Sequence, residues 1–180
     1  MFPKPYADIV ARLRVPSGFL IVVVFAWFSQ PTPESMGLGI PISLLGLALR
    51  AWAAGCLAKN QQLATGGPYA YTRNPLYLGT LMVAAGLAIA SRSVGLATLF
   101  AAVFLFVYLP VIQNEEQHLR KLFPEYAAYA EQVPALWPRM RGQAIQLPAF
   151  RWSLYFKNQE YQAGAGFLAG ALFLLWKMLR

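Results

Sequence analysis

Residues 67–79 read GPYAYTRNPLYLG and join two strongly apolar segments of the chain. The glycine pair that precedes Pro68 predicts a turn, because glycine adopts positive φ and proline fixes its own φ. Asn74 and Pro75 predict the start of a helix, since asparagine is a favoured N-cap and proline fits the first helical position. The stretch therefore predicts a polar loop that leads the chain into a second apolar helix.

The rest of the chain is unusually apolar. Of its 180 residues, 58% are hydrophobic and 12% are charged, whereas soluble domains carry about 25% charged residues. Apolar segments occupy residues 16–29, 37–58, 75–90, 94–112 and 163–179. A membrane-spanning helix needs about 20 residues, so the shorter segments require help from their flanks. The sequence predicts an all-α integral membrane protein, a single domain over residues 1–180 built as a bundle of about five transmembrane helices.

Basic residues predict the orientation of this bundle. Eleven of the fifteen lysines and arginines lie in the N-terminal segment or in the connections 59–74 and 113–162: Lys4, Arg12, Arg14, Lys59, Arg73, Arg120, Lys121, Arg139, Arg141, Arg151 and Lys157. Loops rich in these residues stay on the cytoplasmic side. We therefore expect a multi-pass protein with its N-terminus and both connections in the cytoplasm and its C-terminus outside. Arg50 lies within a span, and we expect its long side chain to reach back toward the interface near Lys59; a buried pair with a functional role is the alternative.

Composition also limits the chemistry. The single cysteine, Cys56, excludes an intrachain disulfide, and the single histidine, His118, makes a multi-histidine metal site impossible. We therefore expect no metal. The net charge of +8 is explained by membrane topology. No basic stretch alternates with aromatic residues as a nucleic-acid groove requires, so we expect no nucleic-acid partner.

The connection 113–162 is uncommonly long for a simple link between two spans. It opens with NEEQHLRKLFPEYAAYAEQV (114–133), for which we expect one helix that ends before Pro134. Residues 149–161 read AFRWSLYFKNQEY and interleave aromatic with basic residues, a pattern typical of a helix that lies in the membrane interface. Any chemistry is therefore expected on the inner face, where this connection meets residues 59–74.

Two groups of polar residues on that face allow structural or functional interpretations. Tyr69, Tyr71 and Tyr77 could form an aromatic belt at the interface, or they could flank an anion and a flat base at a helix N-terminus. Glu115 and Glu116 could be a hydrated helix start that the helix dipole favours. Alternatively, a carboxylate of this pair accepts hydrogen bonds from ribose hydroxyls or binds a cationic ligand.

Together the motifs are more specific than either group alone. In order, xLxTxGPYxYxRNPxYxG, an apolar hairpin, EExxLxxxF, YxxY and VPxxxP fall within residues 44–138. This set resembles the isoprenylcysteine carboxyl methyltransferase family, integral-membrane enzymes related to the phospholipid N-methyltransferases. The resemblance implies that the inner-face loop and the glutamate helix form a cytoplasmic pocket for S-adenosyl-L-methionine. Residues 139–180, with the interfacial helix and the last span, lie outside the resemblance.

The resemblance also implies roles for individual residues. Those implied to bind the cofactor are Gln61, Gln62, Leu63, Ala64, Tyr69, Asn74, Pro75, Leu76, Tyr77 and Glu115. Glu115 and Tyr77 are the implied catalytic residues. Asn74 replaces a motif histidine, so this position can form hydrogen bonds but cannot titrate. Val111 replaces an arginine that holds the substrate carboxylate in the eukaryotic prenylcysteine enzymes, which argues against a prenylcysteine substrate.

The methyl acceptor implied by this architecture is hydrophobic or lipid-like and reaches the site from the bilayer, while the cofactor arrives from the cytoplasm. A carboxylate acceptor needs no general base at neutral pH, whereas an amine must first lose a proton. Near the motifs, Glu115 and Glu116 are the obvious groups that could take up that proton. We therefore expect methylation at a carboxylate or another oxygen, with this substrate and membrane lipids as the partners of the protein.

Two other functions fit part of the pattern. Sterol reductases share a related inner-face motif but bind NADPH, whose 2′-phosphate requires clustered basic residues. Near the glutamate helix, Arg120 and Lys121 are the basic residues that could serve. A non-catalytic bundle or a small transporter would place more polar residues within its spans than this chain does. A methyltransferase is the favoured interpretation.

Overall fold

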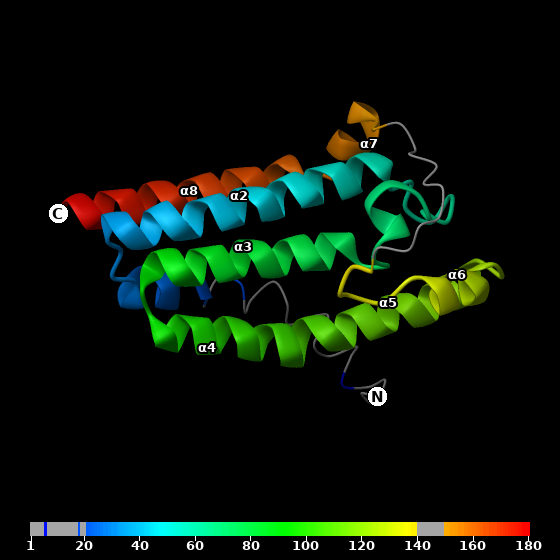
Figure 1. Cartoon of the computed structure of the whole chain (residues 1–180), viewed down its shortest axis with the longest axis horizontal. Helices are drawn as coiled ribbons and strands as arrows, with labels where there is room; N and C mark the ends of the chain where they lie inside the picture. The colour runs from blue at the N-terminus through cyan, green and yellow to red at the C-terminus, as the bar shows by residue number, and fades with distance from the viewer. Residues whose placement is uncertain (1–5, 7–17, 19–20, 140–149) are drawn as a thin grey trace.

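The computed structural model describes residues 6, 18, 21–139 and 150–180, and over these ranges the chain is helical and forms no β-strand (Figure 1). Residues 21–28 are helical. The elements that follow are α2 (Pro33–Cys56), the 3₁₀ helix η1 (Gly67–Ala70), α3 (Pro75–Ser91), α4 (Val94–Val103), the π-helical segment η2 (Phe104–Tyr108), α5 (Leu109–Leu122), α6 (Tyr126–Gln132), α7 (Trp152–Lys157) and α8 (Tyr161–Leu179). The predicted all-α membrane fold is confirmed.

Within the described part of the chain, three helical stretches are long and apolar enough to cross a membrane: Pro33–Cys56, Val94–Leu122 and Tyr161–Leu179. The apolar helix Pro75–Ser91 has 17 residues, which is near the lower limit for a span. These helices correspond to four of the five apolar segments of the sequence. Part of the segment 16–29 lies outside the described residues, as do Lys4, Arg12, Arg14 and Arg141.

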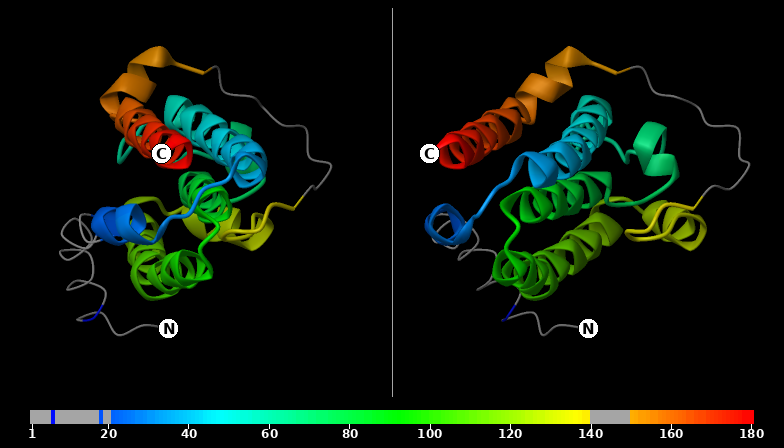
Figure 2. Two further views of the ribbon diagram at one scale, coloured as in Figure 1. Left: turned by 90° about the vertical axis from the view of Figure 1, so that its left-hand side faces the viewer. Right: turned by 60° about the vertical axis from the view of Figure 1, so that its left-hand side comes forward.

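α2 and α3 form the tightest pair in the bundle, and glycines allow the close approach. A Cβ added to Gly46 would lie 2.7 Å from the carbonyl oxygen of Gly79, and one added to Gly39 would collide with the carbonyl of Gly86. Between these crossings Ser43 donates a hydrogen bond to the carbonyl of Val83, 3.1 Å away. Small residues let membrane helices approach closely and form such bonds. In the end-on view of Figure 2, α3 lies between α2 and α4, with α8 beside α2.

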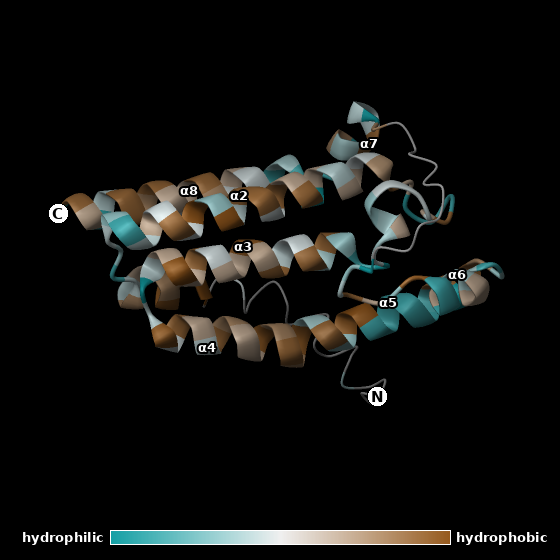
Figure 3. Cartoon of the chain, in the orientation of Figure 1, coloured by the Kyte–Doolittle hydropathy of each residue, from teal (hydrophilic) through white to brown (hydrophobic). Residues whose placement is uncertain are grey.

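α3 and α4 form the tight hairpin that brings the two polar motifs to one end of the molecule. Arg92 ends α3 in a left-handed conformation with φ 51°, and the side chain of Ser93 caps α4 by accepting a bond from the backbone of Leu96. The start of α3 and the end of α5 therefore return to the same end (Figure 1). Colouring by hydropathy shows that this end is the hydrophilic one, over α5 and α6 (Figure 3).

α4, η2 and α5 form one continuous helical stretch from Val94 to Leu122, so Glu115 lies inside a helix and the interpretation of a helix start at that position is wrong. Pro110 explains the π-helical segment that precedes it, because proline lacks the N–H that would bond the carbonyl four residues back. That carbonyl belongs to Phe106 and accepts a hydrogen bond from the Tyr6 hydroxyl at 2.8 Å. The backbone of Leu109 bonds Phe104, five residues back.

The helix expected over residues 114–133 is divided in two. α5 ends at Leu122, Phe123 is extended with φ −125° and ψ 108°, and α6 begins at Tyr126. Pro124 explains the break, because proline disfavours the helical conformation of the residue before it. α6 ends before Pro134 as expected.

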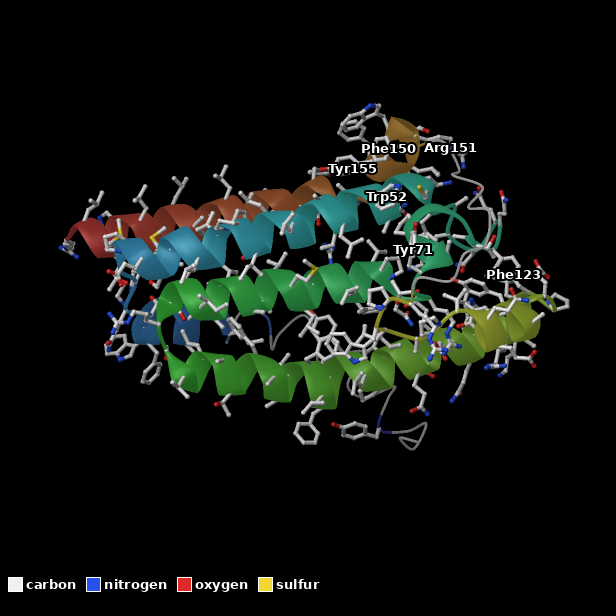
Figure 4. All side chains as sticks on the ribbon, viewed as in Figure 1. Trp52, Tyr71, Phe123, Phe150, Arg151 and Tyr155 are labelled. Atoms are coloured by element: carbon white, nitrogen blue, oxygen red, sulfur yellow. The ribbon has the colours of Figure 1, made fainter. Side chains whose placement is uncertain are left out.

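The aromatic stretch near the end of the chain forms only a short helix, α7, which packs on the C-terminal end of α2. The ring of Phe150 occupies the space that a side chain at Gly55 would need, and its centroid lies 4.9 Å from that of Trp152. Figure 4 shows Phe150, Arg151 and Tyr155 together on this side, near Trp52 of α2. Gln159 then turns the chain into α8 through a left-handed conformation with φ 56°.

Candidate functional site

A cavity of about 1070 Å³ opens at the polar end, between α2, α3, α5, α6, α8 and the loop that carries η1. Ligand pockets commonly enclose about 300–1,000 Å³, so this cavity is large enough for a small-molecule ligand. Nine of the ten residues expected to bind the cofactor line it: Gln62, Leu63, Ala64, Tyr69, Asn74, Pro75, Leu76, Tyr77 and Glu115. Gln61 is exposed and does not contribute to the lining.

The two residues expected to be catalytic contact each other. The Tyr77 hydroxyl on the first turn of α3 donates a hydrogen bond to Glu115 Oε2 on α5, at 2.9 Å. The Tyr77 ring also packs edge-on against Tyr108, with their centroids 6.0 Å apart. The hairpin of α3 and α4 therefore places a carboxylate and a phenol in one wall of the cavity, although 38 residues separate them in sequence.

Asn74 holds the N-cap position of α3, but its side chain makes no capping hydrogen bond, so the predicted capping role is wrong. Its amide instead donates to the carbonyl oxygen of Ala135 at 2.9 Å and reaches Glu116 Oε1 at 3.4 Å. Pro75 at the first helical position still begins the helix. Asn74 thus joins the start of α3 to the segment that follows α6.

Glu116 faces a different set of groups from Glu115. Its Oε2 lies 3.4 Å from Nη1 of Arg73 in a partly buried ion pair, and its other oxygen is the one that Asn74 approaches. Glu115 lines the cavity and Glu116 does not. The two adjacent carboxylates therefore separate, one toward the cavity and one toward the loop that supports it.

Tyr69 places a buried phenol beside the cavity. Its side chain lines the cavity, it is 6% exposed, and its hydroxyl has no hydrogen-bond partner among the described residues. Burial, with a smaller contribution from the Glu115 charge, raises the pKa of Tyr69 far above its ordinary value. The hydroxyl therefore stays protonated and can donate a hydrogen bond to a ligand. The Tyr129 hydroxyl, 2.7 Å from the Tyr69 carbonyl, fixes the backbone at this point.

Arg50 does not reach back toward Lys59, as the sequence suggested, but forms an ion pair with Glu160. Its Nε and Nη2 lie 2.6 and 2.9 Å from the two carboxylate oxygens, a bidentate geometry that strengthens the pair. Nη1 donates to the carbonyl of Leu76 at 3.3 Å and also to the Thr80 hydroxyl. The favoured expectation for Arg50 is wrong, because the acid at the N-cap of α8 pairs with its guanidinium.

Sequence reasoning therefore missed Thr80 and Glu160 and favoured the wrong one of two interpretations for Arg50; all three residues line the cavity. A signal was present, because a charged residue inside an apolar segment indicates a partner or a function. Glu160 lies three residues before the last apolar segment and was the available acid. At the polar end of the molecule, the loops and α5 contribute further basic residues to the lining: Lys59, Arg73, His118 and Lys121. Tyr71 and Phe123 also lie at this end of the molecule (Figure 4).

Fold and site together define a class: a membrane-embedded helical protein with a large cavity that is polar at the end where the loops meet. The family model for phospholipid methyltransferases matches residues 36–126, half of the chain and most of the cavity wall. The chain belongs to the phospholipid methyltransferase family, and methyl transfer in a membrane is the activity that this membership indicates.

Two curated relatives are bacterial resistance proteins. The chain is 36% identical over 112 residues to the cobalt-zinc-cadmium resistance protein CzcN of Cupriavidus metallidurans, covering 59% of this chain and 50% of the relative. It is 35% identical over 116 residues to the nickel-cobalt-cadmium resistance protein NccN of Alcaligenes xylosoxydans xylosoxydans, covering 63% and 53% respectively. The chain thus spans about half the length of the curated relatives it matches. No solved structure matches.

Proposed function

We propose that this protein transfers a methyl group from S-adenosyl-L-methionine to a hydrophobic or lipid-like small molecule, at a carboxylate or another oxygen. The observation that carries the proposal is the convergence of Tyr69, Tyr77 and Glu115 on one cavity, within a family of methyltransferases. The proposed domain comprises residues 1–180. Family membership favours this function over an NADPH-dependent reductase and over a non-catalytic bundle.

The residues present fit the cofactor. The Tyr69 hydroxyl is a buried donor without a protein acceptor, which suits a ligand oxygen or nitrogen. The Glu115 carboxylate can accept hydrogen bonds from ribose hydroxyls, and aromatic faces such as Tyr77 can flank a positive sulfur. Lys59 and Lys121, which also line the cavity, could pair with the carboxylate of the cofactor. Asn74, Pro75 and Leu76 would then shape the wall, together with Gln62, Leu63 and Ala64.

When bound, the cofactor would supply an already activated methyl group on a positively charged sulfur. The protein must then align the acceptor with that methyl group and exclude water. The hydrogen bond from Tyr77 to Glu115 fixes both side chains before any ligand arrives, so little reorganisation is needed. An oxygen acceptor such as a carboxylate needs no proton removed, and the mechanism requires no base from the chain.

The membrane orientation belongs to the same proposal. A cytoplasmic cofactor requires the cavity mouth, the loop 59–74 and the connection 113–162 to face the cytoplasm, with a multi-pass bundle behind them. The distribution of basic residues supports this orientation. The names of both relatives concern metal resistance, and within the described residues no cluster of histidine, cysteine, aspartate and glutamate could hold a metal ion.

Calorimetric titration of the purified protein with S-adenosylhomocysteine, the demethylated product, tests the proposal. We expect saturable one-site binding and no comparable binding of NADPH. Binding of NADPH in place of S-adenosylhomocysteine, or binding of neither, would contradict the proposed function.

A further inference from the structure

The segment around α7 exposes aromatic side chains next to basic ones, outside the cavity. This surface, which we call the α7 patch, consists of Phe150, Arg151, Trp152, Phe156 and Lys157. Trp152 is 65% exposed and Phe156 is 57% exposed, and because they lie four residues apart they share one face of the helix. Exposed apolar groups with a polar rim mark sites of interaction with a protein or a membrane.

The fold holds α7 firmly on the C-terminal end of α2. The backbone N–H of Arg151 donates to the carbonyl of Gly55 at 3.0 Å, and the side-chain amide of Asn158 donates to the carbonyl of Leu57 at 2.9 Å. Leu154 is buried and lies on the face of the helix opposite to the two exposed rings. The packing of α7 against the bundle therefore directs its aromatic face outward.

The exposed rings form a continuous aromatic surface. The ring centroid of Trp152 lies 4.9 Å from that of Phe150 and 6.2 Å from that of Phe156, which in turn lies 6.4 Å from Tyr161. α7 lies at the end of the molecule where α5 and α6 are hydrophilic (Figure 3), so this surface is placed where the spans give way to the polar connections. Aromatic side chains favour that level of a bilayer, among the lipid head groups.

The charge around the aromatic rings is positive. Between Glu131 and Glu160 the sequence contains four basic residues and no aspartate or glutamate. Glu160 is 7% exposed and is already paired with Arg50. Arg151 precedes the first residue of α7 and Lys157 is its last residue, and both side chains are exposed. The charge of the patch therefore complements an anionic partner.

We propose that the α7 patch is a docking surface for anionic phospholipids of the bilayer that holds the protein. Trp152 and Phe156 lie among the glycerol groups and upper acyl chains, and Arg151 and Lys157 pair with the phosphate groups. Each basic residue near an anionic membrane surface adds roughly a fivefold preference. This docking goes beyond the proposed methyl transfer and does not depend on it.

The docking surface and the cavity are neighbours along the chain. No residue of the α7 patch lines the cavity, whereas Asn158 and Glu160, which directly follow α7, do line it. α7 also lies outside residues 36–126, which the family model matches. The patch is therefore a separate site, and lipids docked on it hold one wall of the cavity at the membrane surface.

Quenching of Trp152 fluorescence by brominated lipids in nanodiscs tests the docking surface. Trp152 becomes the single tryptophan when phenylalanine replaces the other four: Trp27, Trp52, Trp137 and Trp176. The nanodiscs contain phosphatidylcholine and the same mole fraction of either brominated phosphatidylglycerol or brominated phosphatidylcholine. We expect stronger quenching by the anionic lipid, equivalent to a local enrichment of at least about fivefold.

Removing the two charges separates the electrostatic contribution from the aromatic one. Arg151→Gln combined with Lys157→Gln should bring the enrichment of phosphatidylglycerol close to one, because the rings remain and the charges are gone. The matched control is Arg92→Gln combined with Arg180→Gln, which removes two exposed basic residues at the opposite end of the bundle (Figure 1). Its enrichment should stay within about twofold of the parent, because those charges lie beyond the screening length.

Equal quenching by the two lipids, or an equal loss of enrichment in the two double variants, would overturn the proposal. Weak quenching by both lipids, with two copies of the chain in each nanodisc, would show that a second copy covers the patch and would also overturn it. If the single-tryptophan variant fails to fold by circular dichroism, native mass spectrometry decides instead. Protein with its natural tryptophans should then retain more phosphatidylglycerol than phosphatidylcholine, and the Arg151 and Lys157 double variant should lose that difference.

Discussion

Glu115→Ala removes the carboxylate that joins α5 to α3 in the cavity wall. In the proposed complex Glu115 accepts a charge-assisted hydrogen bond from the cofactor, and such a bond contributes about 1.5–3 kcal/mol. The affinity for S-adenosylhomocysteine should therefore fall roughly 10- to 150-fold. Tyr77 loses its 2.9 Å partner, but it lies partly exposed at the wall, where water can replace the carboxylate. The free energy of unfolding should therefore drop by no more than about 2 kcal/mol.

Glu116→Ala is the matched control, since it removes the same group one position away on the same helix. Glu116 pairs with Arg73 and approaches Asn74 but does not line the cavity. Its loss should lower thermal stability. The affinity of the folded variant for S-adenosylhomocysteine should stay within about threefold of wild type. Calorimetry on both variants, with circular dichroism to confirm folding, separates the two roles. Equal affinities for wild type and Glu115→Ala would refute the reasoning.

Four further predictions follow from particular contacts. Tyr69→Phe should lower the affinity for S-adenosylhomocysteine about 2- to 12-fold by calorimetry. The melting temperature should not fall, because the hydroxyl has no hydrogen-bond partner among the described residues, and a large loss of stability would contradict this. Gly79→Leu should cost about 1–3 kcal/mol in denaturant unfolding, while Gly164→Leu, in open space, should be nearly neutral; equal effects would show that the α2–α3 seam is not tight. Because Val111 stands where the prenylcysteine enzymes have an arginine, the protein should leave farnesylated cysteine analogues nearly unmethylated in a labelled-methyl assay. Robust turnover would disprove the argument from Val111. Fused reporters should place the N-terminus inside and the C-terminus outside, and the opposite result would exclude a cytoplasmic cavity mouth.

The parts of the site that the sequence predicted are those governed by local rules. A short turn at Arg92 and Ser93 requires the two neighbouring helices to run back along each other, so the start of α3 and the later glutamates must meet at one end. The bond between Tyr77 and Glu115 follows from that hairpin. Pro75 begins its helix where proline at a first helical position predicts it.

The parts that the sequence did not predict depend on partners far away in the chain. Arg50 and Glu160 are 110 residues apart, and nothing in the local pattern of either residue identifies the other. Asn74 has a favourable N-cap position, but its amide nitrogen donates to the carbonyl of Ala135, 61 residues later, and its side-chain oxygen makes no capping bond. The break at Phe123 was in contrast readable from Pro124, which follows it, because proline disfavours a helical conformation of the residue before it.

An experimental structure with S-adenosylhomocysteine bound is the measurement that tests the central claim most directly. The account predicts the ligand in the cavity, with a ribose hydroxyl within hydrogen-bonding distance of Glu115 and the Tyr69 hydroxyl donating to the ligand. The ligand bound elsewhere, or in the cavity with Tyr69 and Glu115 both out of reach, would contradict it.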